Sequence, residues 1–261
     1  MLASMDGTIM PKAEATVPVT DEGLVRGDGV FEVVRLYGGR PFALDEHLAR
    51  MERSAQNLRL EVDFAALAGE IAALLEAHGD GDAALRVMCT RGGRRIALIE
   101  DVARFPATIA LSVVTYSPVR VLDAVKSLSY AGNMLATRLA KERGADDALL
   151  VTPHGRVLEA PTSSFFYVRD GKLITPPLDE HILDSITRRK VLELFDVEER
   201  ATTLDDVAAA EEAFLASTFK EALPVHAIDD IVSFTAPGPV TREVAEAVSA
   251  RIAEELGAAA S

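Results

Sequence analysis

Cysteine, tryptophan and basic residues are scarce in this sequence, and each scarcity excludes a structural feature or a class of binding partner. The 261 residues include one cysteine, Cys89, and no tryptophan. A single cysteine excludes a disulfide within the chain, and its apolar neighbours in A-L-R-V-M-C-T predict a buried thiol. Basic residues are few, with 27 lysines and arginines against 41 aspartates and glutamates. The resulting net charge of −14 argues against nucleic acid or an anionic membrane as a partner.

Long apolar runs are also missing. No stretch approaches the length of a membrane span, and the first twelve residues, M-L-A-S-M-D-G-T-I-M-P-K, lack the basic-then-apolar pattern of a secretory signal. We therefore expect a cytoplasmic protein. Hydrophobic residues make up 49% of the chain, enough for a sizeable core. A chain of this length forms one large domain or two modest ones.

Alternation of apolar residues indicates that the first half is a sheet with a pair of helices. V-F-E-V-V-R-L-Y is followed by two glycines and R-P-F-A-L, a pattern typical of a β-hairpin. Asp45 is expected to cap a first amphipathic helix, and a second helix is predicted over 63–77. Two strands, at 83–91 and 107–116, follow. We predict that residues 1–116 form a small α+β domain.

The second half predicts more strands, separated by turn signals such as P-H-G and D-G. A short segment with a proline and mixed polarity, 117–123, is the predicted interdomain linker, and residues 124–261 are the predicted large domain. Helices are expected at 133–143, 187–195 and 241–256, and strands at 148–152, 156–160, 165–168, 172–175 and 214–217.

Lys126 differs from the other five lysines because apolar residues flank it in V-L-D-A-V-K-S-L. We expect a strand here that leads into a helix starting near Gly132. Burial disfavours the charged form of a lysine, and an uncharged amine is a nucleophile toward aldehydes, the first step of Schiff-base chemistry. A lone lysine near a strand end more often keeps its ammonium in water. The residue by itself therefore assigns no function.

The motifs that follow Lys126 change this interpretation. In order they are G-A-D-D-A-L-L-V, then G-R-V-L-E, then L-I-T-P-P, then S-I-T-R. This series resembles the class IV aminotransferases, the fold-type IV pyridoxal-phosphate (PLP) enzymes, and the resemblance runs from about Asp21 to about Val225. The family includes D-amino-acid aminotransferases, branched-chain aminotransferases and aminodeoxychorismate lyases. The resemblance implies an α+β fold of two domains, a small N-terminal α/β domain and a larger C-terminal domain with a β-barrel-like core.

The same resemblance assigns residues to PLP. Lys126 matches the lysine that bonds the cofactor aldehyde, and Glu159 matches the glutamate that keeps the pyridine nitrogen protonated. Arg50 matches the arginine that binds the phosphate, with Arg53 one turn further on as a rival. Further phosphate contacts are implied at the start of a helix and at a hydroxyl: Ile186, Thr187 and Thr218. No metal site is expected.

Two residues depart from the family pattern. Ser185 stands where the family commonly has glycine before I-T-R, which weakens the inferred phosphate turn. Ser164 stands where the family commonly has asparagine. No cofactor contact is therefore assigned to Ser164.

The implied reaction is transamination. An amino acid gives its amino group to the cofactor, and a 2-oxo acid such as pyruvate or 2-oxoglutarate then receives it, with ping-pong kinetics. Lys126 is the expected general base that moves the Cα proton. An aminodeoxychorismate lyase would use the same residues to eliminate pyruvate, so it remains an alternative.

The substrate is predicted from F-E-V-V-R, in which Phe31, Val33 and Arg35 share one face of a strand. This is a hybrid of Y-x-V-x-K in D-amino-acid enzymes and F-x-G-x-R in branched-chain enzymes. K-S-L directly after Val125 favours the D-amino-acid type, with a branched-chain L-amino-acid enzyme as the alternative. Phe31 and Val33 are predicted to contact the substrate.

A cation is needed to bind the substrate carboxylate. In D-amino-acid enzymes an arginine and a histidine bind that carboxylate, but here no histidine follows the strand that ends at Arg91. Arg26 and Arg91 are the predicted donors, and Arg94 and Arg95 lie nearby in the sequence. We also expect at least a homodimer, with the site between the two domains and closed by a neighbouring subunit, to which Arg26 would reach.

Overall fold

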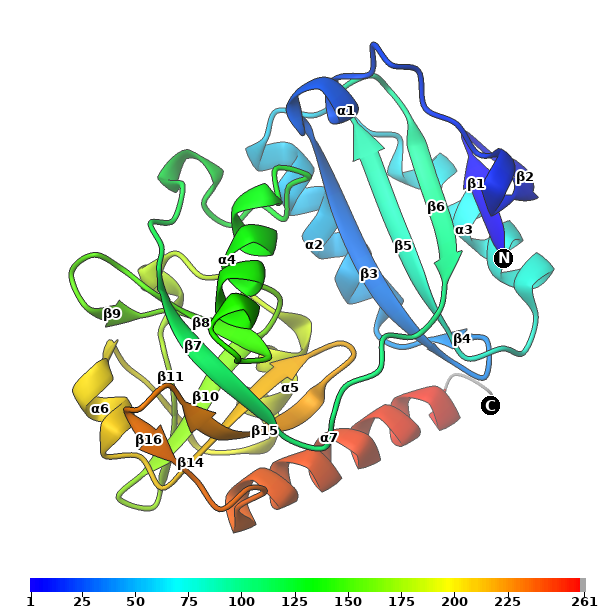
Figure 1. Cartoon of the computed structure of the whole chain (residues 1–261). Helices are drawn as coiled ribbons and strands as arrows, with labels where there is room; N and C mark the ends of the chain where they lie inside the picture. The colour runs from blue at the N-terminus through cyan, green and yellow to red at the C-terminus, as the bar shows by residue number, and fades with distance from the viewer. Residues whose placement is uncertain (259–261) are drawn as a thin grey trace. The chain divides into compact units, whose positions relative to one another are not determined.

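The structure is a computed structural model that describes residues 1–258, and it contains two compact units (Figure 1). Unit 1 comprises Met1–Ala103, Ala124–Tyr130 and residues 254–258, and unit 2 comprises Arg104–Asp123 and Ala131–Ala253. The predicted domain division at 117–123 stays a prediction. The compact units differ from it in that residues 104–116 group with unit 2 and 124–130 with unit 1.

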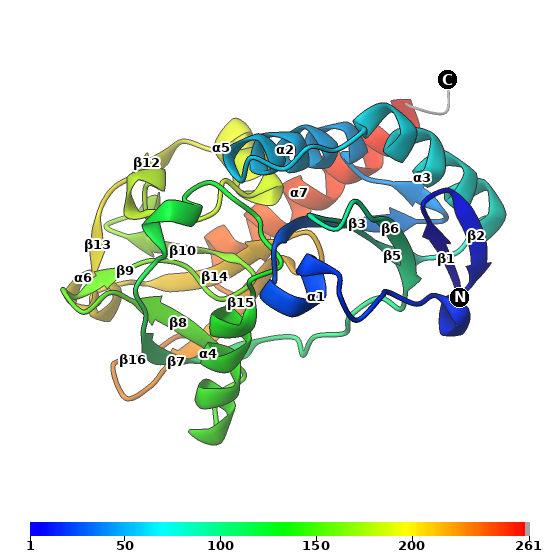
Figure 2. The ribbon, with the colours of Figure 1, turned by 90° about the horizontal axis from the view of Figure 1, so that it is seen from above.

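Unit 1 contains an antiparallel sheet of six strands in the order β2-β1-β6-β5-β3-β4. Helices α2 and α3 lie against the same face of this sheet (Figures 1 and 2). The strands are β1 (Leu2–Met5), β2 (Thr8–Pro11), β3 (Gly29–Tyr37), β4 (Arg40–Pro41), β5 (Ala83–Thr90) and β6 (Arg95–Glu100). The helices are η1 (Lys12–Glu14), α1 (Glu22–Arg26), α2 (Leu44–Asn57) and α3 (Phe64–His78).

The predicted hairpin is confirmed as β3 and β4, with Gly38 and Gly39 between them. Both glycines have positive φ, 53° and 75°. A Cβ on Gly39 would lie 2.2 Å from the carbonyl oxygen of Gly79. Glycine is required at this turn because any side chain would meet that backbone.

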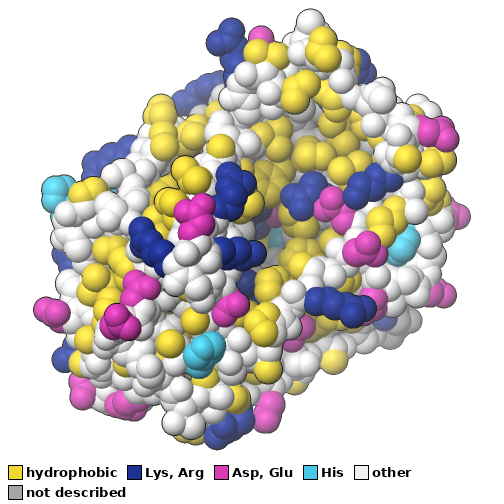
Figure 3. All heavy atoms as spheres, in the orientation of Figure 1, with side chains coloured by type: hydrophobic (Ala, Val, Ile, Leu, Met, Phe, Trp, Pro, Cys, Tyr) yellow, Lys and Arg dark blue, Asp and Glu magenta, His cyan; other side chains and the backbone are white. Residues whose placement is uncertain are grey.

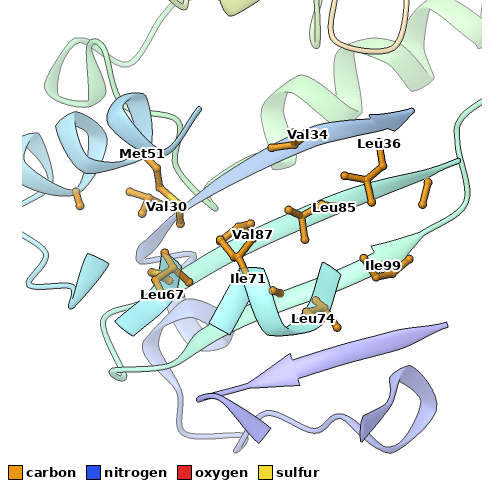
Figure 4. Close-up of a cluster of buried hydrophobic side chains, with 14 of the residues drawn as sticks. Val30, Val34, Leu36, Met51, Leu67, Ile71, Leu74, Leu85, Val87 and Ile99 are labelled. Atoms are coloured by element: carbon orange, nitrogen blue, oxygen red, sulfur yellow. The ribbon is translucent and has the colours of Figure 1, made fainter. Parts of the chain in front are cut away.

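The core of unit 1 lies between the sheet and its two long helices (Figure 4). Alternate residues of β3, Val30, Val34 and Leu36, are fully buried and pack in one cluster with Met51 of α2 and Ile71 of α3. This alternation leaves the intervening residues of β3 on the opposite face. Phe31, Val33 and Arg35 therefore share the face that α2 and α3 do not cover, as the sequence predicts.

The two helices begin in different ways. The Asp63 side chain accepts a hydrogen bond from the Ala66 N–H at 2.9 Å, so Asp63 caps α3. The prediction that Asp45 caps α2 is wrong, because the cap position is Ala43, at a φ of 53°. Asp45 instead lies in the first turn of α2, where a carboxylate is favoured by the helix dipole.

Unit 2 is built on a curled sheet of ten strands, in the order β12-β11-β10-β14-β15-β7-β8-β9-β13 with β16 beside β15 (Figure 1). Strand β7 pairs in parallel with β8 and with β15. The strands are β7 (Ile109–Thr115), β8 (Asp147–Val151), β9 (Arg156–Val157), β10 (Ser164–Arg169), β11 (Lys172–Thr175), β12 (Val197–Glu199), β13 (Thr202–Thr203), β14 (Glu212–Ser217), β15 (Glu221–Ile228) and β16 (Val232–Ser233). The helices are η2 (Arg120–Leu122), α4 (Ala131–Glu142), η3 (Leu178–Glu180), α5 (Ile186–Leu194), α6 (Leu204–Ala208) and α7 (Pro239–Ala258).

The predicted fold class is confirmed: an α+β protein whose second half has a barrel-like sheet. Strands β6 and β15 were not among the predicted elements. The strand predicted at 156–160 is shorter, because β9 ends at Val157. None of the helices within residues 1–258 is long and apolar enough to cross a membrane. Figure 3 shows acidic and basic side chains interspersed among hydrophobic ones on one face of the molecule.

Candidate active site

Lys126 lies in a short extended segment that runs along the edge of β3. The prediction of a regular strand here is wrong, because the segment makes only an isolated bridge, between Ser127 and Val30. The Lys126 carbonyl accepts the Phe31 N–H at 3.0 Å, and the Gly29 carbonyl accepts the Leu128 N–H at 2.9 Å. These bonds pair Lys126 with Phe31, so the two side chains lie on the same face of the sheet.

Glycine is what allows this close pairing. A Cβ on Gly29 would lie 2.4 Å from the Cys89 carbonyl oxygen and 2.7 Å from a methyl carbon of Leu128. On the other side of the segment, the Lys126 N–H donates to the Ser54 hydroxyl of α2 at 3.1 Å. The backbone of Lys126 is thus fixed to both β3 and α2.

The Lys126 amine lies over two aromatic rings. Its Nζ is 4.4 Å from the ring centroid of Phe31 and 5.8 Å from that of Tyr130. The two rings meet edge to face, with centroids 5.2 Å apart and an angle of 80°. The sequence predicted Phe31 as a substrate contact in the other domain, and not its position beside Lys126. It gave no role to Tyr130, four residues after the lysine, because a lone aromatic in a loop carries no signal of its neighbours.

Arg50 is buried on the helix-covered face and is paired with Glu32. Its Nε and one Nη each donate to a different carboxylate oxygen of Glu32 at 2.7 Å, and His47 Nδ1 donates to Glu32 at 2.8 Å. Burial alone would raise the pKa of the Glu32 carboxyl. The charge of Arg50 and the bonds from His47 and Arg50 outweigh it and lower the pKa to about 2.

His47 is uncharged in this group. Burial lowers the pKa of its imidazole below the usual value, and the bond to Glu32 only partly opposes that effect. Because Glu32 is ionised, the Nδ1 that faces it carries the proton. Glu32 and His47 are absent from the predicted site, although E-H-L-A-R places a histidine three residues before Arg50, on the same helical face. The rival residue, Arg53, is exposed.

Of the other predicted substrate residues, Val33 lies on the sheet, whereas Arg26 and Arg91 are paired with carboxylates. Val33 is half-buried on the same face as Phe31. Arg26 is exposed at the end of α1 and pairs with Glu22 at 2.7 Å. Arg91 follows β5; its guanidinium donates to Asp28 at 2.5 Å and to the carbonyl oxygens of Leu58 and Arg59 at the end of α2.

The two nearby alternatives also have acidic partners. Arg94 pairs with Asp6 at 2.6 Å, and Arg95 pairs with Glu70 at 2.7 Å. The structure therefore brings Lys126 and Phe31 together within unit 1, while Arg91 lies at the C-terminal end of α2. Binding of the substrate carboxylate by Arg26 or Arg91 stays a prediction.

Glu159 lies in unit 2, two residues after β9. Its Oε1 accepts the N–H of Leu183 at 3.1 Å, in the loop that leads into α5. Burial raises the pKa of the Tyr116 phenol, and the negative charge of Glu159 raises it further. The Glu159 carboxylate is thus bonded to the loop that leads into α5, the helix whose first residues are the predicted phosphate contacts.

The helix predicted at 187–195 is α5, which begins one residue earlier, at Ile186, and has Ser185 as its N-cap. The Ser185 hydroxyl accepts the Arg188 N–H at 3.5 Å. The backbone of Ser185, at φ −74° and ψ 138°, is ordinary extended backbone, so the missing glycine causes no strain here. Ile186 and Thr187 are buried in the first turn, where free N–H groups favour an anion.

Thr218 lies in the turn between β14 and β15 and is half-buried. The turn is fastened by Lys220, a buried lysine whose Nζ donates to Asp147 at 3.1 Å and to the Ser163 hydroxyl at 2.9 Å. Desolvation lowers the pKa of Lys220, while Asp147 opposes that shift. Ser164 is buried, and its hydroxyl has no hydrogen-bond partner in the described part of the chain.

The sequence profile of amino-transferase class IV matches residues 29–228. The chain belongs to the class IV aminotransferases. It is 32% identical to a D-alanine aminotransferase of Bacillus licheniformis, with 98% of each chain covered. It is also 32% identical to a putative branched-chain-amino-acid aminotransferase of Methanocaldococcus jannaschii, with 93% of each covered.

Solved structures agree with this membership. A branched-chain aminotransferase from Thermoproteus uzoniensis with norvaline has a TM-score of 0.89 and 28% identity, over 98% of this chain and 95% of that one. A fold IV-transaminase from Curtobacterium pusillum has a TM-score of 0.85 and 30% identity, over 95% and 92%. A hypothetical aminotransferase from Mycobacterium tuberculosis, in a PLP-bound form, has a TM-score of 0.87 and 26% identity, over 98% and 100%.

The predicted family, enzyme class and cofactor are therefore confirmed: this is a PLP-dependent aminotransferase. The donor set also fits PLP chemically. An amine suits the aldehyde, a carboxylate suits the pyridine nitrogen, and a helix N-terminus with a nearby hydroxyl suits the phosphate. The role of each single residue is part of the proposal that follows.

Proposed function

We propose that this class IV aminotransferase moves the amino group of a D-amino acid to a 2-oxo acid such as pyruvate or 2-oxoglutarate. The observation that carries the assignment of residues is the position of the Lys126 amine over Phe31, on the face of the sheet that α2 and α3 leave uncovered. The D-amino-acid preference draws support from K-S-L after Val125 and from the D-alanine aminotransferase relatives.

Each predicted residue has a role in this proposal. Bound PLP would supply an electron sink at its pyridine ring, which makes the substrate Cα proton acidic. Lys126 bonds the cofactor between turnovers and, once displaced, carries the Cα proton. Glu159 holds the proton on the pyridine nitrogen. The phosphate is anchored by Ile186 and Thr187 at the start of α5, by the Thr218 hydroxyl and by Arg50.

Phe31 and Val33 are the proposed contacts to the substrate side chain. Arg26 or Arg91 is the proposed donor to the substrate carboxylate. Branched-chain L-amino acids are the second candidate substrates, because a putative branched-chain enzyme is also 32% identical and a branched-chain enzyme with norvaline has a similar fold.

Two experiments test the proposal. Borohydride reduction of the protein loaded with PLP is expected to fix the label on Lys126, with Lys141→Ala as a control that keeps the label and Lys126→Ala as a variant that loses it. A label on another lysine would overturn the residue assignment. The substrate class follows from kcat/KM with D-alanine against L-leucine and L-valine, each with 2-oxoglutarate, and a higher value for the L-donors would replace D- by branched-chain specificity.

We also propose that the protein is at least a homodimer and is located in the cytoplasm. The support is a stretch of exposed apolar residues in unit 1: Val19, Leu24 and Val25 are 81%, 62% and 56% exposed. Apolar surface of this kind is typical of interaction sites, and two-fold dimers are the commonest soluble assembly. Sedimentation is expected to give at least the mass of a dimer. Leu24→Asp is expected to weaken the association of the subunits. An active protein at monomer mass would contradict the proposal.

A further inference from the structure

Lys220 lies at the end of the curled sheet where several of its strands begin. Strand β14 is antiparallel to both β10 and β15, whereas β7 pairs in parallel with β15 and with β8. Strands β7, β8, β10 and β15 therefore run in one direction and start at the same end of the sheet. Lys220 directly precedes β15, Asp147 is the first residue of β8, and Ser163 directly precedes β10. The topology thus brings these three residues to one end of unit 2.

The amine of Lys220 connects these strand starts. Its Nζ pairs with Asp147 at 3.1 Å and donates to the hydroxyls of Ser163 at 2.9 Å and Thr162 at 3.5 Å. The ring of Phe105, shortly before β7, has its centroid 5.3 Å from the same Nζ. Lys220 is 9% exposed and Asp147 is 8% exposed. A buried amine of this kind is tolerated because its partners replace the water that it has lost.

Asp147 is itself fixed by other parts of unit 2. Its Oδ1 accepts the Thr137 hydroxyl of α4 at 2.8 Å and the N–H of Ala148 at 2.9 Å, and its Oδ2 accepts the Lys220 amine. A carboxylate that several donors hold is a rigid partner for a lysine. The ion pair therefore ties the segment that ends at Lys220 to β8 and α4.

The turn that Lys220 closes is short and contains a disfavoured backbone angle at its end. It consists of Thr218, Phe219 and Lys220, between the cross-strand partners Ser217 and Glu221. The Lys220 N–H donates to the Ser217 hydroxyl at 3.3 Å, and Glu221 has a φ of 51°, in the left-handed region. Such a conformation persists where surrounding contacts hold it. The side chain of Lys220 supplies contacts of this kind two residues after Thr218.

We propose that Lys220 is a positioning residue for the phosphate of PLP, because its amine fixes the turn that presents the Thr218 hydroxyl. This rests on the proposed function, in which Thr218 binds the phosphate. Without the amine, the turn loses its bonds to β8 and to the segment before β10. The Thr218 hydroxyl then spends less time in the position from which it reaches the phosphate. Lys220 acts through Thr218 and is assigned no contact to the cofactor.

The test measures binding of the phosphate and does not depend on transamination. The full-length chain, freed of cofactor, is dialysed to equilibrium against PLP and, separately, against pyridoxal, which has the same ring and aldehyde but no phosphate. The ratio of the two dissociation constants, pyridoxal over PLP, reports the contribution of the phosphate. A general loosening of the fold changes both constants together and leaves their ratio unchanged.

Lys220→Met removes the amine and keeps most of the apolar stem. We expect the Kd of PLP to rise about tenfold and that of pyridoxal to stay within about twofold, because about one hydrogen bond to a charged group is lost. Lys172→Met, at an exposed lysine on β11, is the matched control and should leave both constants unchanged. Thr218→Val should also lower the ratio about tenfold. The double variant should fall no further than Thr218→Val alone, because Lys220 acts through Thr218.

An unchanged ratio in Lys220→Met beside a lowered ratio in Thr218→Val would overturn the proposal, and so would additive effects in the double variant. If Lys220→Met does not fold, Ser163→Ala carries the test, since it removes one acceptor and leaves the pair with Asp147. The ratio should then fall by about two- to threefold, and a ratio equal to that of the wild type would again overturn the proposal.

Failure of the proposed function gives different results. An unchanged ratio in Thr218→Val would remove Thr218 from the phosphate site, and the inference about Lys220 with it. A borohydride label on a lysine other than Lys126 would remove the role of Lys126 and leave the ratios of the dissociation constants as they are. The two failures are therefore distinguishable.

Discussion

Glu32 and Arg50 form a two-point ion pair inside unit 1, with both N–O distances at 2.7 Å and both side chains buried. The pair connects β3 to α2, the strand that carries Phe31 to the helix that holds the Lys126 backbone through Ser54. The carboxylate that neutralises Arg50 also sets its orientation, because it fixes two nitrogens of the planar guanidinium.

We predict that Glu32→Gln lowers the free energy of unfolding by about 3–5 kcal/mol, because it removes the carboxylate that pairs with the buried guanidinium of Arg50. Urea unfolding measures the change. Glu52→Gln, an exposed glutamate on α2, is the matched control and should change stability by less than about 0.5 kcal/mol. Equal stability of the two variants would show that the pair contributes little.

The same pair predicts a dependence on pH. The Glu32 pKa is lowered from 4.5 to about 2 in the folded protein, so its contribution to stability is complete above the unfolded value. That contribution is lost as the pH falls from about 4.5 toward 2. The difference in unfolding free energy between wild type and Glu32→Gln should therefore shrink over this interval. A difference that stays constant would place the pKa of Glu32 outside it.

The sequence predicted most of the fold because its elements have regular patterns. Alternation in β3 and the glycine pair after it determine a hairpin locally, and the helix predicted over 63–77 is α3, with Asp63 as its cap. It did not predict β15, although E-A-L-P-V-H-A-I pairs with β14 and β7, because proline and histidine interrupt its apolar pattern. Asp45 was assigned as a cap because a cap at Ala43 with positive φ leaves no sequence signal.

Residues of the candidate site could be predicted only where they belong to a recognisable sequence motif. Lys126 and Glu159 stand in ordered motifs, but Phe31 and Ser54, which contact Lys126, lie far from it in the chain. Tyr130 and His47 became visible once the fold had brought them to Phe31 and Glu32. Such long-range contacts depend on tertiary packing, which periodicity does not report.

We predict that Glu159→Gln lowers kcat/KM for transamination by about two to three orders of magnitude. Glutamine can still accept the Leu183 N–H, so the loop before α5 keeps its bond while the charge that we propose for the pyridine nitrogen is lost. PLP binding, followed by absorbance, should change far less than turnover, because the charge matters most when the Cα proton leaves. Near-normal turnover would assign the pyridine proton to another group.

Cys89 is predicted to be unreactive in the folded protein. Its side chain is buried, and burial raises the pKa of the thiol to about 12. The nucleophilic thiolate is therefore scarce at mildly alkaline pH. A thiol reagent such as dithiobis-nitrobenzoate should titrate no thiol in the native protein and one per chain in guanidinium chloride. Rapid labelling of the native protein would show that β5 opens locally.

Glu212 is predicted to be the residue that fastens the start of α7 to the curled sheet. Its carboxylate, on β14, accepts the N–H of Val240 at 3.0 Å and both the N–H and the hydroxyl of Thr241 at 2.9 and 2.8 Å. A Cβ on Gly238 would lie 2.0 Å from the Glu212 carboxyl carbon, so glycine is needed for this approach.

Glu212→Ala removes the acceptor for three donors in the first turn of α7, two of them from buried Thr241. Hydrogen bonds to a charged group contribute about 1.5–3 kcal/mol each but share one carboxylate here, so we expect a loss of about 3 kcal/mol in the free energy of unfolding. The neighbouring Glu211 is exposed on the same chain segment, and Glu211→Ala should cost less than about 0.5 kcal/mol. Glu212→Gln keeps one acceptor oxygen without its charge and should fall between the two. If Glu212→Ala unfolds at the same urea concentration as Glu211→Ala, the N-terminus of α7 is held by its apolar contacts, with buried Val244 and Val248, and not by this carboxylate.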